Sequence, residues 1–315
     1  MSEAADERLA VRTRTRRRTR TQIAKRATIA VGAASRLLRL GGGSVIGGRV
    51  GLALEPDLLG RLASGRRSVL VSGTNGKTTT TRLLVAALGG PQAVATSPDG
   101  ANLPSGLTAA LASAAHGASA VLEVDEAYLG KVALSTNPEA VVLLNLSRDQ
   151  LDRVNEVRKV SNRWRDELGQ MRSATVVANA DDPLVVWAAG KSVKPVRFVA
   201  AGQIWHEDAT GCPSCGGRIS FSTDVGWSCT CGFRRPEVYA RLTDDGIEFA
   251  DGRILPISLL LPARCNRANA AMAAVAAGVL GVSETDALAA MSEVRQVEGR
   301  FSNVKIDAVT ARLLL

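Results

Sequence analysis

The segment VLVSGTNGKTTTTRLL, residues 69–84, decides the fold of this chain. It begins with apolar residues of high β propensity, passes through a turn with two glycines, and ends in a run typical of a helix. A strand, a glycine-rich turn and a helix N-terminus direct backbone N–H groups and the helix dipole at one point, where an anion is held. Gly73 and Gly76 permit conformations and close approaches that a Cβ would obstruct. The segment therefore predicts a nucleotide-phosphate site, which we favour over a turn with a solvated lysine.

The residues after the second glycine supply the chemistry of such a site. Lys77 is expected to reach the terminal phosphates of a nucleotide, and the Thr78 hydroxyl is expected to bind its Mg²⁺. The usual phosphate loop has four residues between its glycines, whereas this one has two. The prediction of a nucleotide-phosphate site therefore depends largely on the strand expected before the loop and the helix expected after it.

Charge is concentrated at the N-terminus. The net charge is +9, and residues 1–40 contain 11 Lys and Arg against 3 Asp and Glu, whereas the rest of the chain contains 28 against 27. The stretch RTRTRRRTRTQ, residues 12–22, predicts a disordered tail because its charges repel one another and it has little apolar surface. Nucleic acid and the anionic cytoplasmic membrane surface are its candidate partners. A solvated extension without a partner is an equal alternative.

The composition limits the class of protein. The chain is 46% hydrophobic but only 3% aromatic, which predicts a core of Ala, Val and Leu. No apolar run approaches the roughly 18 residues that span a bilayer, and the N-terminus lacks the apolar region of a secretory signal. A cytoplasmic location is therefore expected, with peripheral contact at the inner face of the plasma membrane left open.

The element pattern favours an α/β protein. Helices are expected over residues 23–40 and in LEPDLLGRLASGR, and strands alternate with helices from Ser68 onward. Near-continuous apolar strands separated by helices predict a doubly wound, mostly parallel sheet. The expected divisions are a disordered tail (1–21), a helical segment (22–65), an ATP-binding central domain (66–303) with an insertion (203–237), and the start of a truncated C-terminal domain (304–315).

Four of the five cysteines form two close pairs, in the pattern C-x2-C-x13-C-x-C. Four thiolates at this spacing complete a tetrahedral Zn²⁺ site and leave no open position for catalysis. Disulfides are the main alternative, and a cytosolic location disfavours them. A structural zinc ribbon is therefore expected, with the ligands Cys212, Cys215, Cys229 and Cys231. The fifth cysteine, Cys265, is expected to be a buried small apolar residue.

Acidic and amide side chains follow the strands predicted after the phosphate loop. Glu123 has apolar neighbours on both sides, which suits a Mg²⁺ ligand better than a solvated side chain. Asp125 and Glu126 are equally consistent with capping of the next helix. The segments NLSRDQLDR and NADDPLV follow two later strands and carry similar side chains. Ligands bind at the carboxyl ends of parallel strands, so these loops are expected near the phosphate loop.

Six motifs resemble the Mur ligase superfamily in order and spacing, a group that includes peptidoglycan-precursor ligases and folylpolyglutamate synthase. They are SGTNGKTTTT, LEVDE, NLSRDQLDR, NADDP, CNRANAAMAA and VEGRFSNV. The zinc-ribbon insertion, the segments GGGSVIGGRVGLALEPDLL and GANLPSGLTAAL, and the absence of an N-terminal UDP-binding domain narrow the resemblance. They make the chain similar to the ligase subunits of lipid II isoglutaminyl synthase.

The resemblance implies roles for particular residues. Those implied at the ATP phosphates are Gly73, Thr74, Asn75, Gly76, Lys77, Thr78 and Thr79. Magnesium is implied on Thr78 and Glu123, and adenine near Asn266 and Asn269. Arg300 is implied to contact the nucleotide, and Lys77, Glu123 and Arg300 form the implied catalytic set. The sequence departs from the family at Gln150, where many members have a magnesium-binding histidine, and around Trp164, where many have a carbamylated lysine.

The implied reaction is ATP-dependent amide formation. The α-carboxylate of D-isoglutamate in the lipid II stem peptide attacks the γ-phosphate, and ammonia from a partner GatD-type glutaminase displaces phosphate from the resulting acyl phosphate to leave isoglutamine. The terminal DAVTARLLL is expected to begin the family's C-terminal domain, which carries its catalytic aspartate. The activity of the chain by itself is therefore an open question.

Two other functions remain as alternatives. One is a different Mur-type ligase that adds an amino acid to a muropeptide or a folate. The other is a non-catalytic module in which the zinc ribbon and the arginine-rich tail hold nucleic acid. The few basic residues and the little aromatic surface of the ribbon count against a stable nucleic-acid complex.

Overall fold

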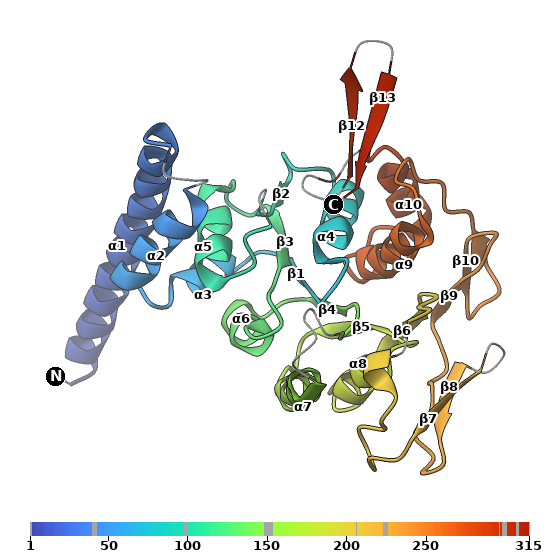
Figure 1. Cartoon of the computed structure of the whole chain (residues 1–315). Coiled ribbons are helices and arrows are strands. Elements are labelled where there is room, and N and C mark those ends of the chain that lie inside the picture. Colours follow the sequence, from blue (N-terminus) through green and yellow to red (C-terminus); the bar gives the residue numbers. More distant parts are fainter. Residues whose placement is uncertain are drawn as a thin grey trace.

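The computed structural model describes most of the chain (Figure 1). The described residues are 2–39, 43–97, 100–147, 154–205, 207–222, 226–295, 297, 301–306 and 309–314. Within them, none of the helices combines the length and the hydrophobicity needed to cross a bilayer.

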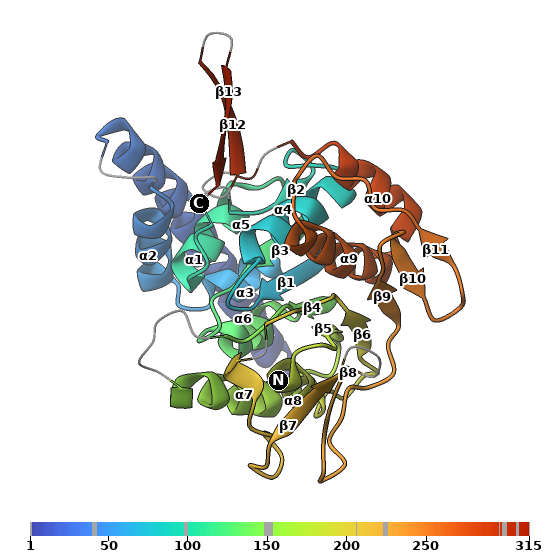
Figure 2. The same ribbon diagram turned by 45° about the vertical axis from the view of Figure 1, so that its right-hand side comes forward.

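A nine-stranded sheet forms the centre of the molecule, in the order β11-β10-β9-β6-β5-β4-β1-β3-β2 (Figure 2). Its strands are β1 (Ser68–Ser72), β2 (Val94–Ala95), β3 (Ser119–Glu123), β4 (Ala140–Leu143), β5 (Thr175–Asn179), β6 (Arg197–Ala200), β9 (Ala240–Leu242), β10 (Ile247–Phe249) and β11 (Ile254–Leu255). In this sheet, neighbouring strands from β2 to β9 run parallel. The pairs β9–β10 and β10–β11 are antiparallel. The predicted doubly wound, mostly parallel sheet is confirmed.

Helices cover both faces of this sheet. The helices are α1 (Ser2–Leu37), α2 (Ser44–Leu54), α3 (Leu58–Ala63), α4 (Lys77–Ala87), α5 (Pro104–Ser113), α6 (Leu129–Thr136), α7 (Val154–Leu168), α8 (Pro183–Ala189), α9 (Arg264–Val279) and α10 (Glu284–Ser292). Of these, α1 and α2 pack against α3 and α5 rather than on the sheet itself (Figure 1). Two separate antiparallel hairpins complete the structure, β7 (Ile219–Ser222) with β8 (Gly226–Cys229), and β12 (Phe301–Ile306) with β13 (Val309–Leu314).

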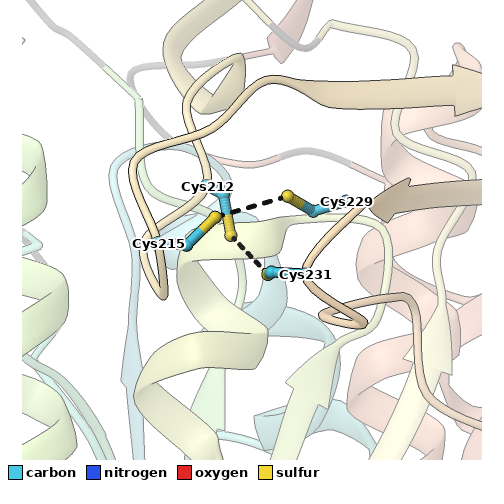
Figure 3. A group of neighbouring side chains, drawn as sticks. All are labelled: Cys212, Cys215, Cys229 and Cys231. Carbon is cyan, nitrogen blue, oxygen red and sulfur yellow. Dashed lines mark hydrogen bonds between the residues drawn. The ribbon is translucent and has the colours of Figure 1, made fainter.

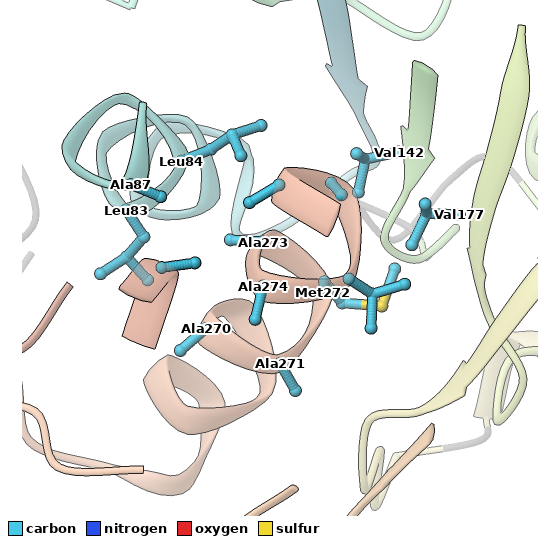
Figure 4. Close-up of a cluster of buried hydrophobic side chains, with 14 of the residues drawn as sticks. Leu83, Leu84, Ala87, Val142, Val177, Ala270, Ala271, Met272, Ala273 and Ala274 are labelled. Atoms are coloured by element: carbon cyan, nitrogen blue, oxygen red, sulfur yellow. The ribbon is translucent and has the colours of Figure 1, made fainter. Parts of the chain in front are cut away.

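Side-chain alternation along the strands divides the interior into two cores. In β1, Val69 and Val71 face the layer of α4, α9 and α10, whereas Leu70 faces the layer of α5 to α8. Every residue of α9 from Ala270 to Ala277 is buried, and most of them are alanines. Their small side chains let α9 pack closely on both α4 and the sheet (Figure 4). This close packing supports the start of α4 and therefore the loop between β1 and α4.

Helix α1 differs from the sequence-based expectation. It begins at Ser2, so the segment predicted to be a disordered tail is helical, and it ends at Leu37, three residues before the predicted end. Ala and Arg have high helix propensity. Once Ala24, Thr28 and Ser35 are buried against the body, extending the helix adds one hydrogen bond for each further residue. Packing of the C-terminal half therefore supports a helix that charge repulsion alone disfavours.

Helix α2 was not predicted, because glycine has low helix propensity. The structure shows why three glycines lie in it. A Cβ on Gly47 would collide with the carbonyl of Thr28, one on Gly48 with the carbonyl of Ser105, and one on Gly51 with the Thr28 hydroxyl. The glycines let α2 pack directly against the backbones of α1 and α5, and this close contact replaces the missing intrinsic propensity.

Candidate nucleotide-binding site

The loop between β1 and α4 has the geometry of a phosphate-binding turn. Gly73 has a φ of 144°, and Gly76, the N-cap of α4, has a φ of 86°. A Cβ on Gly73 would lie 2.9 Å from Leu144 Cβ, and one on Gly76 would lie 2.6 Å from Asn269 Oδ1. Conformation and space therefore both require glycine at these positions. Helix α4 begins directly after the turn, so the unpaired backbone N–H groups of its first turn are directed toward the space that the loop encloses.

Asn145, which follows β4, holds the loop in place. Its Oδ1 accepts from Asn75 N at 2.9 Å, its Nδ2 donates to Asn75 O at 2.9 Å, and its backbone carbonyl accepts from Thr74 N at 2.9 Å. The Thr74 hydroxyl donates to Ser147 O at 3.1 Å. The sequence grouped Asn145 with possible magnesium-site residues, and the structure instead uses its side chain to brace the phosphate loop.

Lys77 lies folded over the loop. Its Nζ is 2.5 Å from Gly73 O, 3.1 Å from Thr74 O and 3.3 Å from Glu126 Oε1. Its side chain is only 13% exposed. The ammonium group therefore already lies at the point where the loop's backbone and the N-terminus of α4 meet, with a carboxylate beside it.

Thr78 and Glu123 face the same small space. An ideal Cβ on Gly100 would lie 3.8 Å from Thr78 Oγ1 and 3.7 Å from Glu123 Oε2. Glu123 is 5% exposed, and it ends β3, the neighbour of β1. A hydroxyl and a carboxylate that converge beside a phosphate loop are oxygen ligands of the kind Mg²⁺ prefers. The donor set fits a magnesium ion bound together with a nucleotide.

A cavity of about 420 Å³ unites these groups with the start of α9. The sequence-predicted residues that line it are Thr74, Asn75, Gly76, Lys77, Thr78, Thr79, Glu123, Asn266 and Asn269. The last residues of β3 and β5 and the loops after β1, β4 and β6 all contribute, so the cavity lies at the carboxyl edge of the sheet. Gly73 lies at the base of the loop, behind these lining residues. Arg300 and Gln150 lie outside the described residues.

Part of the lining could not be expected from the motifs. A segment after β6 supplies Gln203, Ile204 and Trp205, which had been grouped with the zinc insertion. Ala263 also lines the cavity and has a φ of 79°, a conformation that strains a residue with a Cβ. Cys265 is exposed at the cavity rather than buried as expected, because it lies in the first turn of α9, before that helix enters the core.

The remaining carboxylates have structural partners. Asp125 Oδ1 accepts from Ala127 N at 2.9 Å in the turn before α6. The N-cap of α6 is Tyr128 and no side chain caps it, so the capping alternative for Asp125 and Glu126 is wrong. Asp182 caps α8 through Leu184 N and Val185 N, and its Oδ2 accepts from Leu146 N at 2.8 Å. Burial raises the pKa of Asp182 to about 6, although these N–H donors partly oppose the shift. Asp182 therefore fastens two loops at the edge of the cavity.

The four predicted thiols form one cluster (Figure 3). The sulfur atoms of Cys212, Cys215, Cys229 and Cys231 all lie within 4.8 Å of one another. The sulfur atoms of Cys212 and Cys231 are 3.7 Å apart and those of Cys215 and Cys229 are 3.6 Å apart, too far for a disulfide. Tetrahedral ligands about 2.3 Å from one Zn²⁺ are roughly 3.8 Å apart. The arrangement therefore fits a four-thiolate zinc site.

The surroundings of the cluster favour a structural role. Burial raises the pKa of Cys212, whereas the backbone N–H of Cys231 lowers the pKa of Cys229 to about 7. Cys212 and Cys229 pack with Ile219 and Trp227 in a small separate core. A metal held there would fix the two turns of the hairpin, at a distance from the phosphate loop along the chain and in the fold (Figure 2).

The chain has relatives among characterised proteins. The chain is 34% identical over 66% of its length to the MurT subunit of the glutamine-hydrolyzing lipid II isoglutaminyl synthase of Streptococcus pneumoniae, and covers 50% of that protein. It is 28% identical over 62% of its length to the corresponding MurT subunit of Staphylococcus aureus, and covers 48% of it. The chain thus spans about half the length of these curated relatives.

Solved structures show the same fold. A pseudomurein peptide ligase type C from Methanothermus fervidus matches 76% of this chain and 52% of its own, with a TM-score of 0.58 and 23% identity. MurF from Acinetobacter baumannii matches 82% of this chain and 52% of its own, with a TM-score of 0.56 and 17% identity. The model of the Mur ligase middle domain matches residues 71–277. The cavity residues other than Val297 lie within this matched range. The chain therefore belongs to the Mur ligase family.

Proposed function

We propose that the cavity binds ATP and that the chain is the ATP-binding part of a MurT-type ligase of peptidoglycan synthesis. One observation carries this proposal: a single cavity contains the phosphate loop, the Thr78–Glu123 pair and the amide side chains at the start of α9. Its volume of about 420 Å³ lies in the ordinary range for a small-molecule site.

Each group has a role in binding and activation. Lys77 and the N–H groups of the loop offset the negative charge of the β- and γ-phosphates, and Thr78 and Glu123 hold Mg²⁺ against them. Asn266 and Asn269, at the start of α9, also line the cavity, and the adenine is proposed to bind near them. Arg300 is proposed to complete the nucleotide site. The bound Mg–ATP supplies a γ-phosphoryl group that is open to attack by a carboxylate.

The proposed acceptor is the α-carboxylate of D-isoglutamate in the lipid II stem peptide. Phosphoryl transfer converts it to an acyl phosphate, and ammonia displaces phosphate to form isoglutamine. A GatD-type glutaminase subunit is proposed as the source of ammonia, in keeping with the words "glutamine-hydrolyzing" in the names of the related MurT subunits. The cysteine cluster is proposed to hold a structural Zn²⁺.

A lipid-linked substrate requires work at the membrane surface. Helix α1 carries basic residues along its length, and Ile23, Leu37 and Arg26 on it are exposed. We propose that this helix contacts anionic lipid at the cytoplasmic face while the substrate is modified, because both apolar and basic side chains favour that surface. The enzyme would then be cytoplasmic and peripheral to the membrane.

The decisive experiment measures ADP release from the complete enzyme with its glutaminase partner. Lipid II and ammonium chloride should support turnover, and glutamine should replace ammonium only when the partner is present. Release that depends instead on a free amino acid would assign another Mur-type ligase reaction. Tight, salt-sensitive binding of RNA or DNA without any ADP release would favour the nucleic-acid alternative.

A further inference from the structure

The cysteine hairpin, which we define as residues 211–235, is attached to the loop after β5. Trp227 Nε1 donates to Ala180 O at 2.9 Å, and Trp227 is 3% exposed. Next to this contact, Arg235 Nη1 lies 3.1 Å from Asp181 Oδ1. The side chains of Arg235 and Asp181 are only 22% and 10% exposed. The hairpin is thus joined to two adjacent residues of the central domain by a buried hydrogen bond and a shielded ion pair.

The same aspartate also holds the wall of the nucleotide cavity. Asp181 Oδ2 accepts from Gly202 N at 2.7 Å and from Gln203 N at 3.3 Å. Gly202 has a φ of 78°, so the chain turns sharply at this point. The wall segment, residues 201–205, follows that turn and lines the cavity. One carboxylate therefore bonds to the cysteine hairpin with one oxygen and to the cavity wall with the other.

Ala201, the first residue of the wall segment, is buried in the core, but the two apolar residues at its far end are exposed. Ile204 is 75% exposed and Trp205 is 36% exposed. Further polar links run from Gln203 Oε1 to Asn179 Nδ2 at 2.9 Å and from Gln203 Nε2 to Trp205 O at 3.0 Å. Because hydrogen bonds provide most of the support, the position of the wall is sensitive to the loss of any of them.

Arg235 determines whether Asp181 can perform this double role. A carboxylate that is only 10% exposed needs a cationic partner to offset its desolvation. Without Arg235, the Asp181 carboxylate would lose the charge that offsets its desolvation and would turn toward solvent, which weakens its hold on Gly202 and Gln203. The contact between the hairpin and the domain is thereby coupled to the shape of the cavity.

We propose that Asp181 and Arg235 are positioning residues that fix the wall segment for the nucleotide. The inference rests on the proposed function, in which the cavity holds ATP. The phosphate loop is braced by other contacts, through the side chain of Asn145. Loss of the Asp181–Arg235 link should therefore weaken nucleotide affinity and leave phosphoryl transfer from bound ATP unchanged.

The test uses Arg235→Ala and Asp181→Asn in the complete enzyme, with Arg234→Ala as the matched control, since Arg234 is an exposed neighbour. The probe is mant-ATP, followed by energy transfer from tryptophan. We expect its Kd, and the KM for ATP, to rise about tenfold in Arg235→Ala, equivalent to about 1.4 kcal/mol. The kcat value should stay within twofold of the wild type. Arg235→Lys should recover part of the loss, and the double variant should be no weaker than the worse single variant.

The outcomes separate the two proposals. If the wild type fails to bind mant-ATP, the proposed function is wrong. If the wild type binds and Arg235→Ala binds equally well, or loses kcat with an unchanged KM, the positioning role is wrong. If Arg235→Ala does not fold by circular dichroism, Arg235→Lys and Asp181→Asn decide in its place, with the same expected rise in KM and the same result overturning the proposal.

Discussion

The nucleotide cavity and the cysteine cluster are built in opposite ways. The cavity collects side chains from strand ends, from loops and from the start of α9, more than 190 positions apart in the chain. The cluster draws its four thiols from Cys212 to Cys231 and needs only one hairpin. A site formed by one local segment can be predicted from the spacing of its residues in the sequence. A site at the edge of a sheet can be predicted only when the order of the strands is known. The two sites should therefore respond differently to single substitutions.

The largest effect is expected at the phosphate loop. Lys77→Ala should lower ATP turnover by at least about a hundredfold, because the cationic group nearest the transferred phosphoryl is lost. The fold should remain intact, since Asn145 still holds the loop through Thr74 and Asn75 when the Lys77 contacts are lost. ADP release in the complete enzyme measures the effect, and the exposed Lys131→Ala is the control. Turnover near the wild-type value would remove Lys77 from the site.

The cysteine cluster should respond locally. Cys212→Ser should abolish stoichiometric zinc, because three thiolates and a hydroxyl hold the ion far less well than four thiolates. Proteolysis should then cut the hairpin faster, while the central sheet keeps its resistance. Elemental analysis measures the zinc content of Cys212→Ser, with Cys265→Ser as the control. Equal zinc content in the two variants would contradict the zinc assignment.

An intermediate effect is expected at Asp182, which lies between the two regions. Its raised pKa of about 6 means that ionisation disfavours the folded state. Its contribution to stability is therefore largest at low pH and is lost as pH rises from about 4 through about 6, by at most about 3 kcal/mol. Unfolding by urea between pH 4.5 and 7 should show this decline in the wild type relative to Asp182→Asn. Parallel pH profiles for the two proteins would contradict the assignment.

The smallest effect is expected far from both sites. Removing residues 1–21 should leave ATP affinity unchanged and weaken binding to phosphatidylglycerol vesicles. A loss of roughly fivefold, about 1 kcal/mol, corresponds to a single basic residue at an anionic surface. Co-sedimentation with anionic and with neutral vesicles measures it. Equal binding by the full and the shortened chains would leave α1 without a lipid contact.

Sequence reasoning reached the fold because strong local signals agreed with it. The apolar strands, the glycines at positions 73 and 76, and the cysteine spacing are each set by nearby residues. It missed α2, whose glycines are explained only by the backbones of α1 and α5. It also missed the wall formed by Gln203 and Trp205, because only the pairing of β6 with β5 brings that segment to the cavity. The features that were missed depend on contacts between residues far apart in the chain, whereas the features that were predicted depend on neighbouring residues.

The tight fit between Gly76 and Asn269 has a consequence for how a nucleotide enters. A Cβ at Gly76 would lie 2.6 Å from Asn269 Oδ1, and behind Asn269 the alanine face of α9 is packed without exposure. This side of the cavity cannot swing open without disrupting the core. The exposed residues that line the cavity include Cys265, Ile204 and Trp205, so we expect a nucleotide to enter along this exposed rim rather than past the buried face of α9.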